Sequence, residues 1–230
     1  MSDNHTVPAS ALVIIAHPDD AEFTMAGTVA AWVRAGCQVT YVLCTDGNVG
    51  YHGADLTREQ LAALRRTEQR AACAALGVHD VVFLGHDDCT LQPSIELRRE
   101  LVQVIRDRKP EAVLTGDPTE LFFGDSYVNH PDHRAAAQAA IDAVAPAAGV
   151  PLLWPETGPA HQVQRLYIHG NRQPNLWVDI AATLEQKIEA LRQHASQLAH
   201  DPAEMIRAWA AEEAKEHGLD YCESYRVITL

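Results

Sequence analysis

Short apolar runs alternate with longer amphipathic stretches along the first half of the chain. A nearly continuous apolar run is typical of a parallel strand that helices cover on both faces. Four such runs predict strands at residues 11–16, 38–44, 80–85 and 111–116. The stretches between them predict helices at residues 21–35, 57–76 and 93–108. This order favours an α/β fold with a Rossmann-like, doubly wound and mostly parallel sheet flanked by helices.

The helix at 57–76 carries clear signals at both ends. Thr57 and Gln60 have the spacing of a capping box, in which each residue satisfies a backbone N–H of the other. Gly77 follows the last apolar position and is the residue type that most often ends a helix. We therefore expect this helix to have well-defined ends.

The second half of the chain begins with a long polar segment at 117–132. It then predicts helices at 133–149, 182–199 and 202–217, strands at 163–170 and 175–180, and a last strand or extended arm at 221–230. The sequence shows no internal repeat and no linker. We therefore expect residues 1–230 to form a single domain, with residues 1–10 as a flexible N-terminus.

Polar groups follow each of the first four predicted strands. "HPDD" (17–20) follows the first strand, and "GHDD" (85–88) follows the third. The loops at 44–53 and 116–133 follow the second and fourth. Ligands of doubly wound sheets bind beyond the carboxyl ends of the strands, so these groups are predicted to share one rim. The last loop is longer than a connection requires, which indicates binding.

Two His-Pro-Asp segments, at 17–19 and 130–132, suggest a metal site at this rim. His17 and Asp20 lie three residues apart, so a tight turn into a helix could direct both at one point. His133, in the first turn of another helix, would complete a triad of ligands. Two imidazoles and one carboxylate with a fourth position open to water describe a hydrolytic zinc site.

The remaining polar groups of the two segments are candidates for catalysis. Asp19 adjoins the predicted ligand Asp20 and is our candidate general base. His130, as an imidazolium, would stabilise an oxyanion and protonate the leaving amine. Asp132 would orient His130 through its ring N–H, or alternatively support His133.

Each of these residues also has a simpler structural interpretation. An Asp between a strand and a helix is usually a helix cap, and Pro131 at a helix start is normal. A lone His at a strand end is usually a surface residue. The occurrence of two matching clusters favours the metal site instead. For Asp87 and Asp88, we favour turn formers.

Composition excludes several classes of partner. The chain of 230 residues has a formal charge of −13, which argues against nucleic-acid binding. It has no apolar run long enough to span a bilayer and no secretory signal at its N-terminus. Its five cysteines are scattered and never spaced as Cys-x-x-Cys, so a reducing cytoplasm is the predicted location.

"AHPDDAE" (16–22) followed by "HPDH" (130–133) resembles the LmbE-like, or PIG-L, family of zinc-dependent N-deacetylases. Residues 65–78 look like the R-x-x-E helix of that family, and residues 187–197 look like its late K-x-x-A-L-x-x-H-x-S-Q helix. The resemblance covers most of the chain. It implies a Rossmann-like sheet and hydrolysis of an N-acetyl group, commonly on an N-acetylglucosamine-type sugar.

The resemblance also implies roles for individual residues. His17, Asp20 and His133 match the zinc ligands of the family, Asp19 its general base, and His130 its oxyanion-stabilising acid, with Asp132 as partner of that His. The predicted substrate contacts are Arg65, Tyr127, Asn129 and His194. Arg65 alternatively forms an intrahelical pair with Glu68 or Glu59. In some sugar deacetylases of the family a Tyr lies two residues before the first His of the second motif, where this chain has Val128; Tyr127 precedes it.

The sequence therefore predicts a zinc-dependent hydrolase that releases acetate from a small N-acetylated sugar. Alternatives are hydrolysis of another amide, a non-haem Fe²⁺ enzyme using the same ligands, and a non-catalytic α/β module that binds a sugar or nucleotide. The family resemblance makes a homotrimer or homohexamer plausible. The exact substrate does not follow from the sequence.

Overall fold

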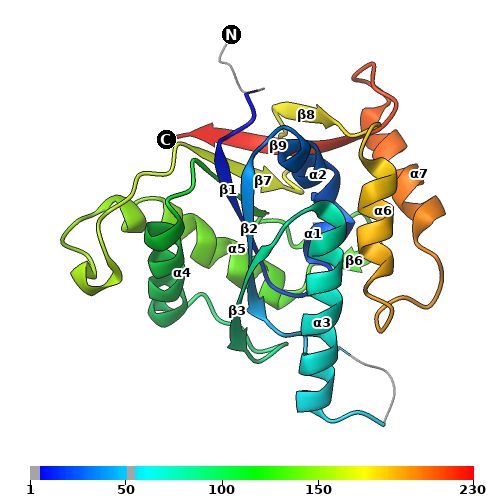
Figure 1. Ribbon diagram of the computed structural model, residues 1–230. Helices are drawn as coiled ribbons and strands as arrows, with labels where there is room; N and C mark the ends of the chain where they lie inside the picture. Colours follow the sequence, from blue (N-terminus) through cyan, green and yellow to red (C-terminus); the bar gives the residue numbers. More distant parts are fainter. Residues whose placement is uncertain (1–5, 51–54) are drawn as a thin grey trace.

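The computed structural model describes residues 6–50 and 55–230. Its central sheet has seven strands in the order β3–β2–β1–β4–β7–β9–β8 (Figure 1). These are β1 (Ser10–Ile15), β2 (Gln38–Thr45), β3 (Asp80–His86), β4 (Ala112–Gly116), β7 (Arg165–His169), β8 (Leu176–Asp179) and β9 (Cys222–Thr229). The first five strands in that order are parallel, and β9 is antiparallel to both of its neighbours. The predicted mostly parallel α/β sheet is confirmed, and the segment 221–230 forms a strand.

Helices cover both faces of the sheet. They are α1 (Asp20–Thr24), α2 (Ala26–Arg34), α3 (Arg58–Leu76), α4 (Ile95–Arg108), α5 (Pro131–Val144), α6 (Leu184–Arg192) and α7 (Ala203–Ala214). Alternate residues of β1 divide between the two layers: Val13 packs in the cluster that includes α2 and α3, and Ile14 packs in the cluster with α4 and α5. Figure 1 shows α4 on one side of the sheet and α3, α6 and α7 on the other. A strand buried on both faces explains the nearly continuous apolar runs.

The ends of α3 follow the predicted signals. The Thr57 hydroxyl accepts a hydrogen bond from the Gln60 N–H at 3.2 Å, and the Gln60 side chain accepts one from the Thr57 N–H at 2.8 Å. Gly77 ends the helix with φ 79°, a left-handed conformation that glycine adopts without strain. The predicted capping box and terminator are both present.

Several predicted elements differ from those observed. The helix predicted at 21–35 is broken at Met25 into α1 and α2. The helix predicted at 133–149 ends at Val144, because Pro146 cannot donate a backbone hydrogen bond, and a short 3₁₀ turn follows at Ala147–Gly149. The helix predicted at 182–199 stops at Arg192. The polar segment 117–132 contains a hairpin of β5 (Phe122–Phe123) and β6 (Tyr127–Val128) that the sequence did not suggest.

The strand order places the predicted rim at a change in chain direction. From β1 the chain moves outward to β2 and β3, then crosses back to β4 on the other side of β1. The carboxyl ends of β1 and β4 therefore form the topological switch point at which ligands of doubly wound sheets bind. The first His-Pro-Asp segment follows β1, and the second opens α5. Residues 1–5, half of the predicted N-terminal tail, lie outside the described residues, and Ser10 opens β1.

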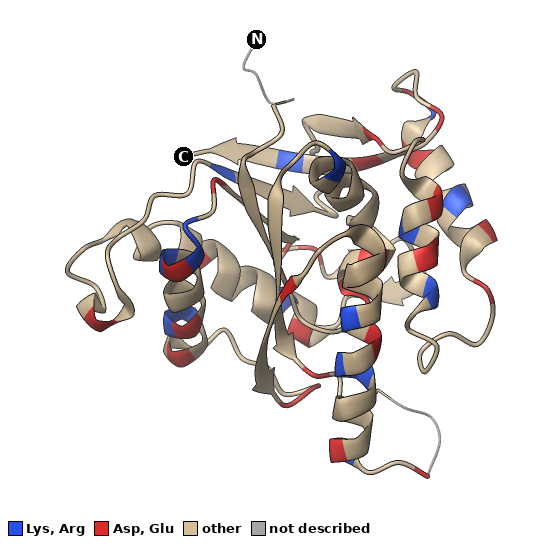
Figure 2. Ribbon diagram, viewed as in Figure 1, with Lys and Arg blue, Asp and Glu red and all other residues tan. Residues whose placement is uncertain are grey.

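Charged residues of both signs are interleaved on α3, α4, α6 and α7 (Figure 2). Among the described residues, none of the helices combines the length and apolarity that crossing a bilayer requires.

A buried ion pair joins the C-terminal strand to the helix layer that carries α1. The Glu223 carboxylate in β9 accepts hydrogen bonds from Gly27 N–H at 2.9 Å and Thr28 N–H at 2.7 Å, at the start of α2. It also binds Lys187 Nζ in α6 at 2.6 Å, with both side chains buried. An anion at a helix N-terminus is favourable, and this contact supplies a reason for α2 to begin separately from α1.

Replacing Glu223 with Gln should lower the free energy of unfolding by about 3 kcal/mol, because Lys187 would lose its buried partner. Burial alone would raise the pKa of Glu223, but the Lys187 charge and hydrogen bonds outweigh burial and hold this pKa below its usual value of 4.5. The stabilisation is therefore complete above pH 4.5 and is lost as the pH falls through the lowered pKa.

Urea unfolding at several pH values checks this prediction. The difference between wild type and Glu223→Gln should shrink as the pH falls below 4.5. Glu185→Gln, which breaks the exposed Glu185–Arg207 pair, is the control and should cost less than about 1 kcal/mol. Equal effects of the two substitutions would contradict the role assigned to Glu223.

Candidate metal and catalytic site

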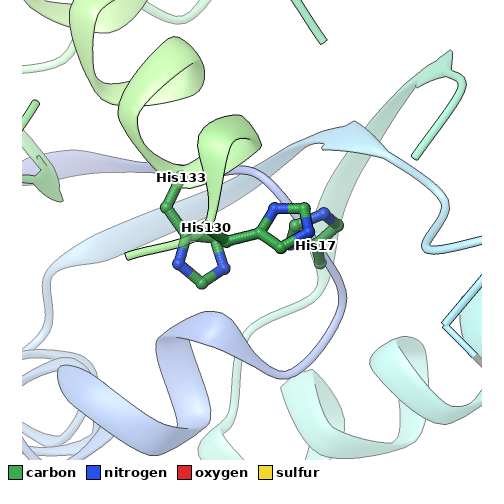
Figure 3. Close-up of side chains that lie close together, drawn as sticks. All are labelled: His17, His130 and His133. Carbon is green, nitrogen blue, oxygen red and sulfur yellow. The ribbon is translucent and has the colours of Figure 1, made fainter. Parts of the chain in front are cut away.

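The two His-Pro-Asp segments meet near the carboxyl end of β1. His17 lies two residues beyond β1, and Asp20 opens α1. His130 caps α5, and His133 lies in the first turn of that helix. Figure 3 shows the imidazoles of His17, His130 and His133 converging from these two segments. Residues more than 100 positions apart in the sequence are therefore brought together.

The Asp20 carboxylate lies between two of these imidazoles. Its Oδ1 is 3.0 Å from His133 Nε2, and its Oδ2 is 3.6 Å from His17 Nδ1. In a tetrahedral zinc site, metal–ligand distances of 2.0–2.2 Å place neighbouring nitrogen and oxygen donors about 3.4 Å apart. The arrangement of these three side chains thus fits the metal site predicted from the sequence.

Backbone groups fix the Asp20 carboxylate in this position. Its Oδ2 accepts hydrogen bonds from His17 N–H at 2.8 Å and Ala16 N–H at 3.1 Å. Burial would raise the pKa of Asp20, but His133 and His17 hold that pKa well below its usual value. The carboxylate is therefore ionised and supplies the negative charge that a divalent cation requires.

The far nitrogens of both candidate ligand imidazoles bind other side chains. His17 Nε2 lies 3.0 Å from Asp88 Oδ1 and 3.4 Å from Asp132 Oδ2. His133 Nδ1 lies 3.2 Å from Asn129 Oδ1, and the Asn129 amide also donates to the Glu120 carbonyl at 2.8 Å. These partners leave His17 Nδ1 and His133 Nε2 as the nitrogens directed at Asp20. Partners of this kind orient metal ligands and set their tautomers.

Three further triads of donor atoms, none of which includes Asp20, lie within 4.8 Å of one another among the described residues, and two of them contain His17. His17, Asp88 and Asp132 are all buried, so they offer no position open to a substrate. The triad of His17, His130 and His133 contains no carboxylate to supply negative charge, and His130 Nδ1 already accepts a hydrogen bond from the Asp132 N–H at 3.2 Å. The set of His17, Asp20 and His133 therefore suits a metal site best, because it includes a carboxylate and is not fully buried.

Asp88 is a residue that the sequence interpretation missed. We expected Asp87 and Asp88 to be turn formers. Asp87 is exposed and pairs with Arg58 at 2.8 Å, but the Asp88 side chain is only 4% exposed and binds His17. The sequence feature that could have indicated this role is the position of Asp88 after β3, at the same rim as "HPDD".

Asp132 has different partners from those predicted. Its fully buried carboxylate accepts hydrogen bonds from Cys89 N–H at 2.7 Å and Leu91 N–H at 3.2 Å, and approaches His17. The expectation that it orients the ring of His130 or His133 is therefore not supported by the geometry. Asp132 instead fixes the loop after β3 and supports the first imidazole. The partner of His133 is Asn129.

His130 is held as a neutral imidazole. Burial and the charges of His17 and His133 lower its pKa. Because Nδ1 accepts the Asp132 N–H, the neutral tautomer carries its proton on Nε2. We had expected an imidazolium; the structure instead provides a neutral N–H donor at the edge of the site.

Asp19 does not act as a helix cap. It occupies the N-cap position of α1 with φ 96°, and its side chain makes no capping hydrogen bond. Its carboxylate instead lies 3.0 Å from Arg65 Nη2. Burial raises the pKa of Asp19 to about 6, with the Arg65 charge opposing the rise. A left-handed non-glycine residue beside a candidate metal site is typical of backbone strain at a functional position.

Arg65 fixes Asp19 and the loops after β1 and β2 by hydrogen bonds. Its guanidinium donates to the carbonyls of Pro18 at 2.6 Å and Gly47 at 3.1 Å, as well as to Asp19. The predicted intrahelical pair with Glu59 or Glu68 is not formed; Glu68 binds Ser196 instead. A Cβ on Gly47 would lie 2.0 Å from Arg65 Nη1, so the loop after β2 requires glycine here.

Only one of the four predicted substrate contacts is exposed. Arg65, Asn129 and His194 are buried, with His194 fully enclosed and its Nε2 3.4 Å from Glu22 Oε2. Tyr127 is 48% exposed on the β5–β6 hairpin. A role for Tyr127 in substrate binding stays a prediction, whereas the three buried side chains are placed to support the groups in front of them.

With the geometry established, comparisons with known proteins identify the family. A family profile described as PIG-L: GlcNAc-PI de-N-acetylase matches residues 12–144, a range that contains both His-Pro-Asp segments. The chain belongs to this family, as the sequence motifs predicted.

Individual relatives agree with this assignment. A diacetylchitobiose deacetylase from Thermococcus kodakarensis is 34% identical over 226 residues, covering 94% of this chain and 82% of the relative. A 1D-myo-inositol 2-acetamido-2-deoxy-alpha-D-glucopyranoside deacetylase from Actinosynnema mirum is 30% identical, covering 84% and 82%. The solved structure of N,N'-diacetylchitobiose deacetylase from Pyrococcus horikoshii superposes with a TM-score of 0.88 at 31% identity, covering 96% of this chain and 84% of that chain.

The Asn129–His133 contact gives a testable prediction. Asn129→Ala should weaken the binding of an added divalent cation by about 10- to 100-fold, because His133 would lose the acceptor that orients its ring. Competition with a chromogenic chelator measures this change. Asn129→Asp keeps an acceptor oxygen and should lose less affinity. Wild-type affinity in Asn129→Ala would show that the contact does not support a ligand.

Proposed function

We propose that this protein is a metal-dependent N-deacetylase that hydrolyses the acetamido group of a small N-acetylglucosamine-type sugar and releases acetate. The observation that carries the proposal is the Asp20 carboxylate between His17 Nδ1 and His133 Nε2, with the partly buried carboxylate of the preceding residue, Asp19, held by Arg65. The named activities of the relatives support the same reaction and substrate class.

The residues that would hold the cation are His17, Asp20 and His133. Zn²⁺ is the metal we propose, since two imidazoles and one carboxylate with an open position suit hydrolytic zinc. Fe²⁺ accepts the same donors, and metal analysis of the purified protein distinguishes them. When bound, zinc would polarise the acetyl carbonyl and lower the pKa of an attacking water.

Asp19 is the proposed general base. Its raised pKa of about 6 leaves it mostly ionised at neutral pH and able to accept a proton from the attacking water. Arg65 holds the carboxylate in place and limits the rise of its pKa. Asp19 can then return the proton to the departing amine, which its position beside the site permits.

His130 is the proposed oxyanion donor. Its Nε2 carries the proton of the neutral tautomer, so it can donate a hydrogen bond to the oxygen on which negative charge develops. Because Nδ1 is fixed to the start of α5, the ring is oriented before substrate binds. Preorganised donors of this type stabilise a transition state without reorganisation at the moment of reaction.

Other aspects of the protein remain predictions. The four buried cysteines and the exposed Cys89 are all free thiols, which supports a reducing location such as the cytoplasm. A homotrimer or homohexamer is also proposed, and sedimentation analysis would establish the assembly. Hydrolysis of a different amide on the same scaffold is the alternative activity.

Asp19→Asn should reduce kcat for acetate release by about 10²- to 10⁴-fold while the metal content stays unchanged. Asparagine tolerates the left-handed backbone at this position, so the fold should be retained. Acetate release from N-acetylglucosamine, N,N'-diacetylchitobiose and an N-acetylglucosaminyl inositol measures the activity. The control is Asp87→Asn, which alters an exposed carboxylate at the same rim. Near-wild-type turnover in Asp19→Asn would reject its assignment as base.

Removal of the metal provides an independent test. Dialysis against a chelator should abolish acetate release from every sugar of the panel, and one equivalent of Zn²⁺ per chain should restore it. Circular dichroism verifies that the metal-free protein stays folded. Full activity of a folded, metal-free protein would contradict metal dependence.

A further inference from the structure

Cys89 is an exposed thiol beside the site that the proposed reaction does not use. It follows β3, and its backbone has φ 66°, an unusual conformation for a residue other than glycine. Its N–H donates to Asp132 Oδ2 at 2.7 Å, which fixes the residue against α5. The Cys89 Sγ lies 3.6 Å from His130 Nε2. The other four cysteines are buried, so this thiol alone among them is open to solvent.

The surroundings of Cys89 form a set of metal donors. Ligand atoms of Asp88, Cys89 and His130 all lie within 4.8 Å of one another. In a tetrahedral site with a zinc–sulfur distance of 2.3 Å and a zinc–nitrogen distance of 2.0–2.1 Å, sulfur and nitrogen lie about 3.6 Å apart. The observed separation of the Cys89 and His130 donors matches this value.

Asp88 gives the set a rigid anionic member. Its side chain is 4% exposed, and it is fixed by His17 Nε2 at 3.0 Å and by the Val49 N–H at 3.4 Å. This contact is with the nitrogen of His17 that faces away from Asp20, while His130 has a donor atom within 4.8 Å of donor atoms of His17 and His133, so the two sets are neighbours. The two sets share no donor atom.

We propose that Asp88, Cys89 and His130 form a second cation site, selective for thiophilic ions such as Zn²⁺ and Cd²⁺, and that its occupation inhibits the enzyme. The inhibition rests on the proposed function, because a cation on His130 Nε2 would remove the donor assigned to the oxyanion. Cation binding itself does not depend on that assignment. A thiolate ligand favours these ions over Mg²⁺ and Ca²⁺.

Cation binding at this site displaces the proton of the Cys89 thiol and moves the ring proton of His130. Burial and the neighbouring Asp88 carboxylate raise the pKa of the Cys89 thiol, so the free thiol is protonated at neutral pH. Binding of the cation forms a metal–sulfur bond and releases that proton to solvent. The imidazole proton of His130 moves from Nε2 to Nδ1 through solvent, and the hydrogen bond from the Asp132 N–H to Nδ1 is lost. The second site should therefore bind more weakly than the first.

Titration of the metal-free protein with Cd²⁺ tests the proposal directly. The wild type should bind two equivalents per chain, and the second should produce the ultraviolet charge-transfer absorption of a cadmium–thiolate bond. Cys89→Ser should bind one equivalent without this absorption. Asp87→Asn, a change in the neighbouring exposed carboxylate, should keep both binding events.

Activity provides the second readout. Excess Zn²⁺ should inhibit acetate release by the zinc-loaded wild type, and Cys89→Ser should need at least about 10-fold more zinc for the same inhibition, with its basal activity unchanged. Cys89→Gly also removes the thiol and relieves the left-handed backbone, so it serves as a second variant if the serine form folds poorly.

The outcomes separate the two proposals. A single equivalent of Cd²⁺ without thiolate absorption in the wild type would overturn the second site. Equal zinc inhibition of wild type and Cys89→Ser would overturn its inhibitory role. Two equivalents with thiolate absorption but no acetate release from any sugar would contradict the proposed function and leave the cation site standing.

Discussion

The position of one carboxylate, that of Asp20, determines what this site can do. It lies between His17 and His133 and brings a negative charge to two imidazoles that belong to different parts of the chain. Two backbone N–H groups at the end of β1 hold one of its oxygens, so the carboxylate is fixed by the strand itself. The sheet order places β4 beside β1, and α5, with His133 in its first turn, follows β4 in the chain and meets Asp20.

A layer of buried polar groups supports this arrangement from behind. Asp88 and Asp132 bind the far side of His17, and Asn129 binds the far side of His133. Arg65 performs a similar task for Asp19 by joining it to the loops after β1 and β2. Burying such groups is unfavourable unless they find partners, and here the partners are the groups that need to be oriented. The site is therefore organised before any substrate arrives.

Local sequence patterns were sufficient for much of the fold and for the centre of the site. Apolar runs identified the parallel strands because each is buried on both faces, and Thr57, Gln60 and Gly77 marked the ends of α3 because caps are local interactions. The repeated His-Pro-Asp segments located His17, Asp20 and His133 because each follows a strand end or opens a helix.

The remaining features depend on contacts between distant segments. Asp88 looked like a turn former because its role depends on how the loop after β3 meets His17. The start of α2, where α1 and α2 divide, donates two hydrogen bonds to Glu223, which lies almost 200 residues later. Asp132 was expected to bind His130 or His133, and Asn129 to contact substrate. The Asp132 carboxylate instead binds backbone N–H groups after β3, and Asn129 binds His133, because the loops around α5 settle which side chain reaches which ring. Sequence spacing alone carries no information about these alignments.

Anomalous diffraction at the zinc edge from crystals of the zinc-loaded protein tests the central claim most directly. The first zinc equivalent should give a peak bonded to His17 Nδ1, Asp20 and His133 Nε2. A peak on the other side of the His17 ring, between Nε2, Asp88 and Asp132, or no peak at any of these residues, would contradict it.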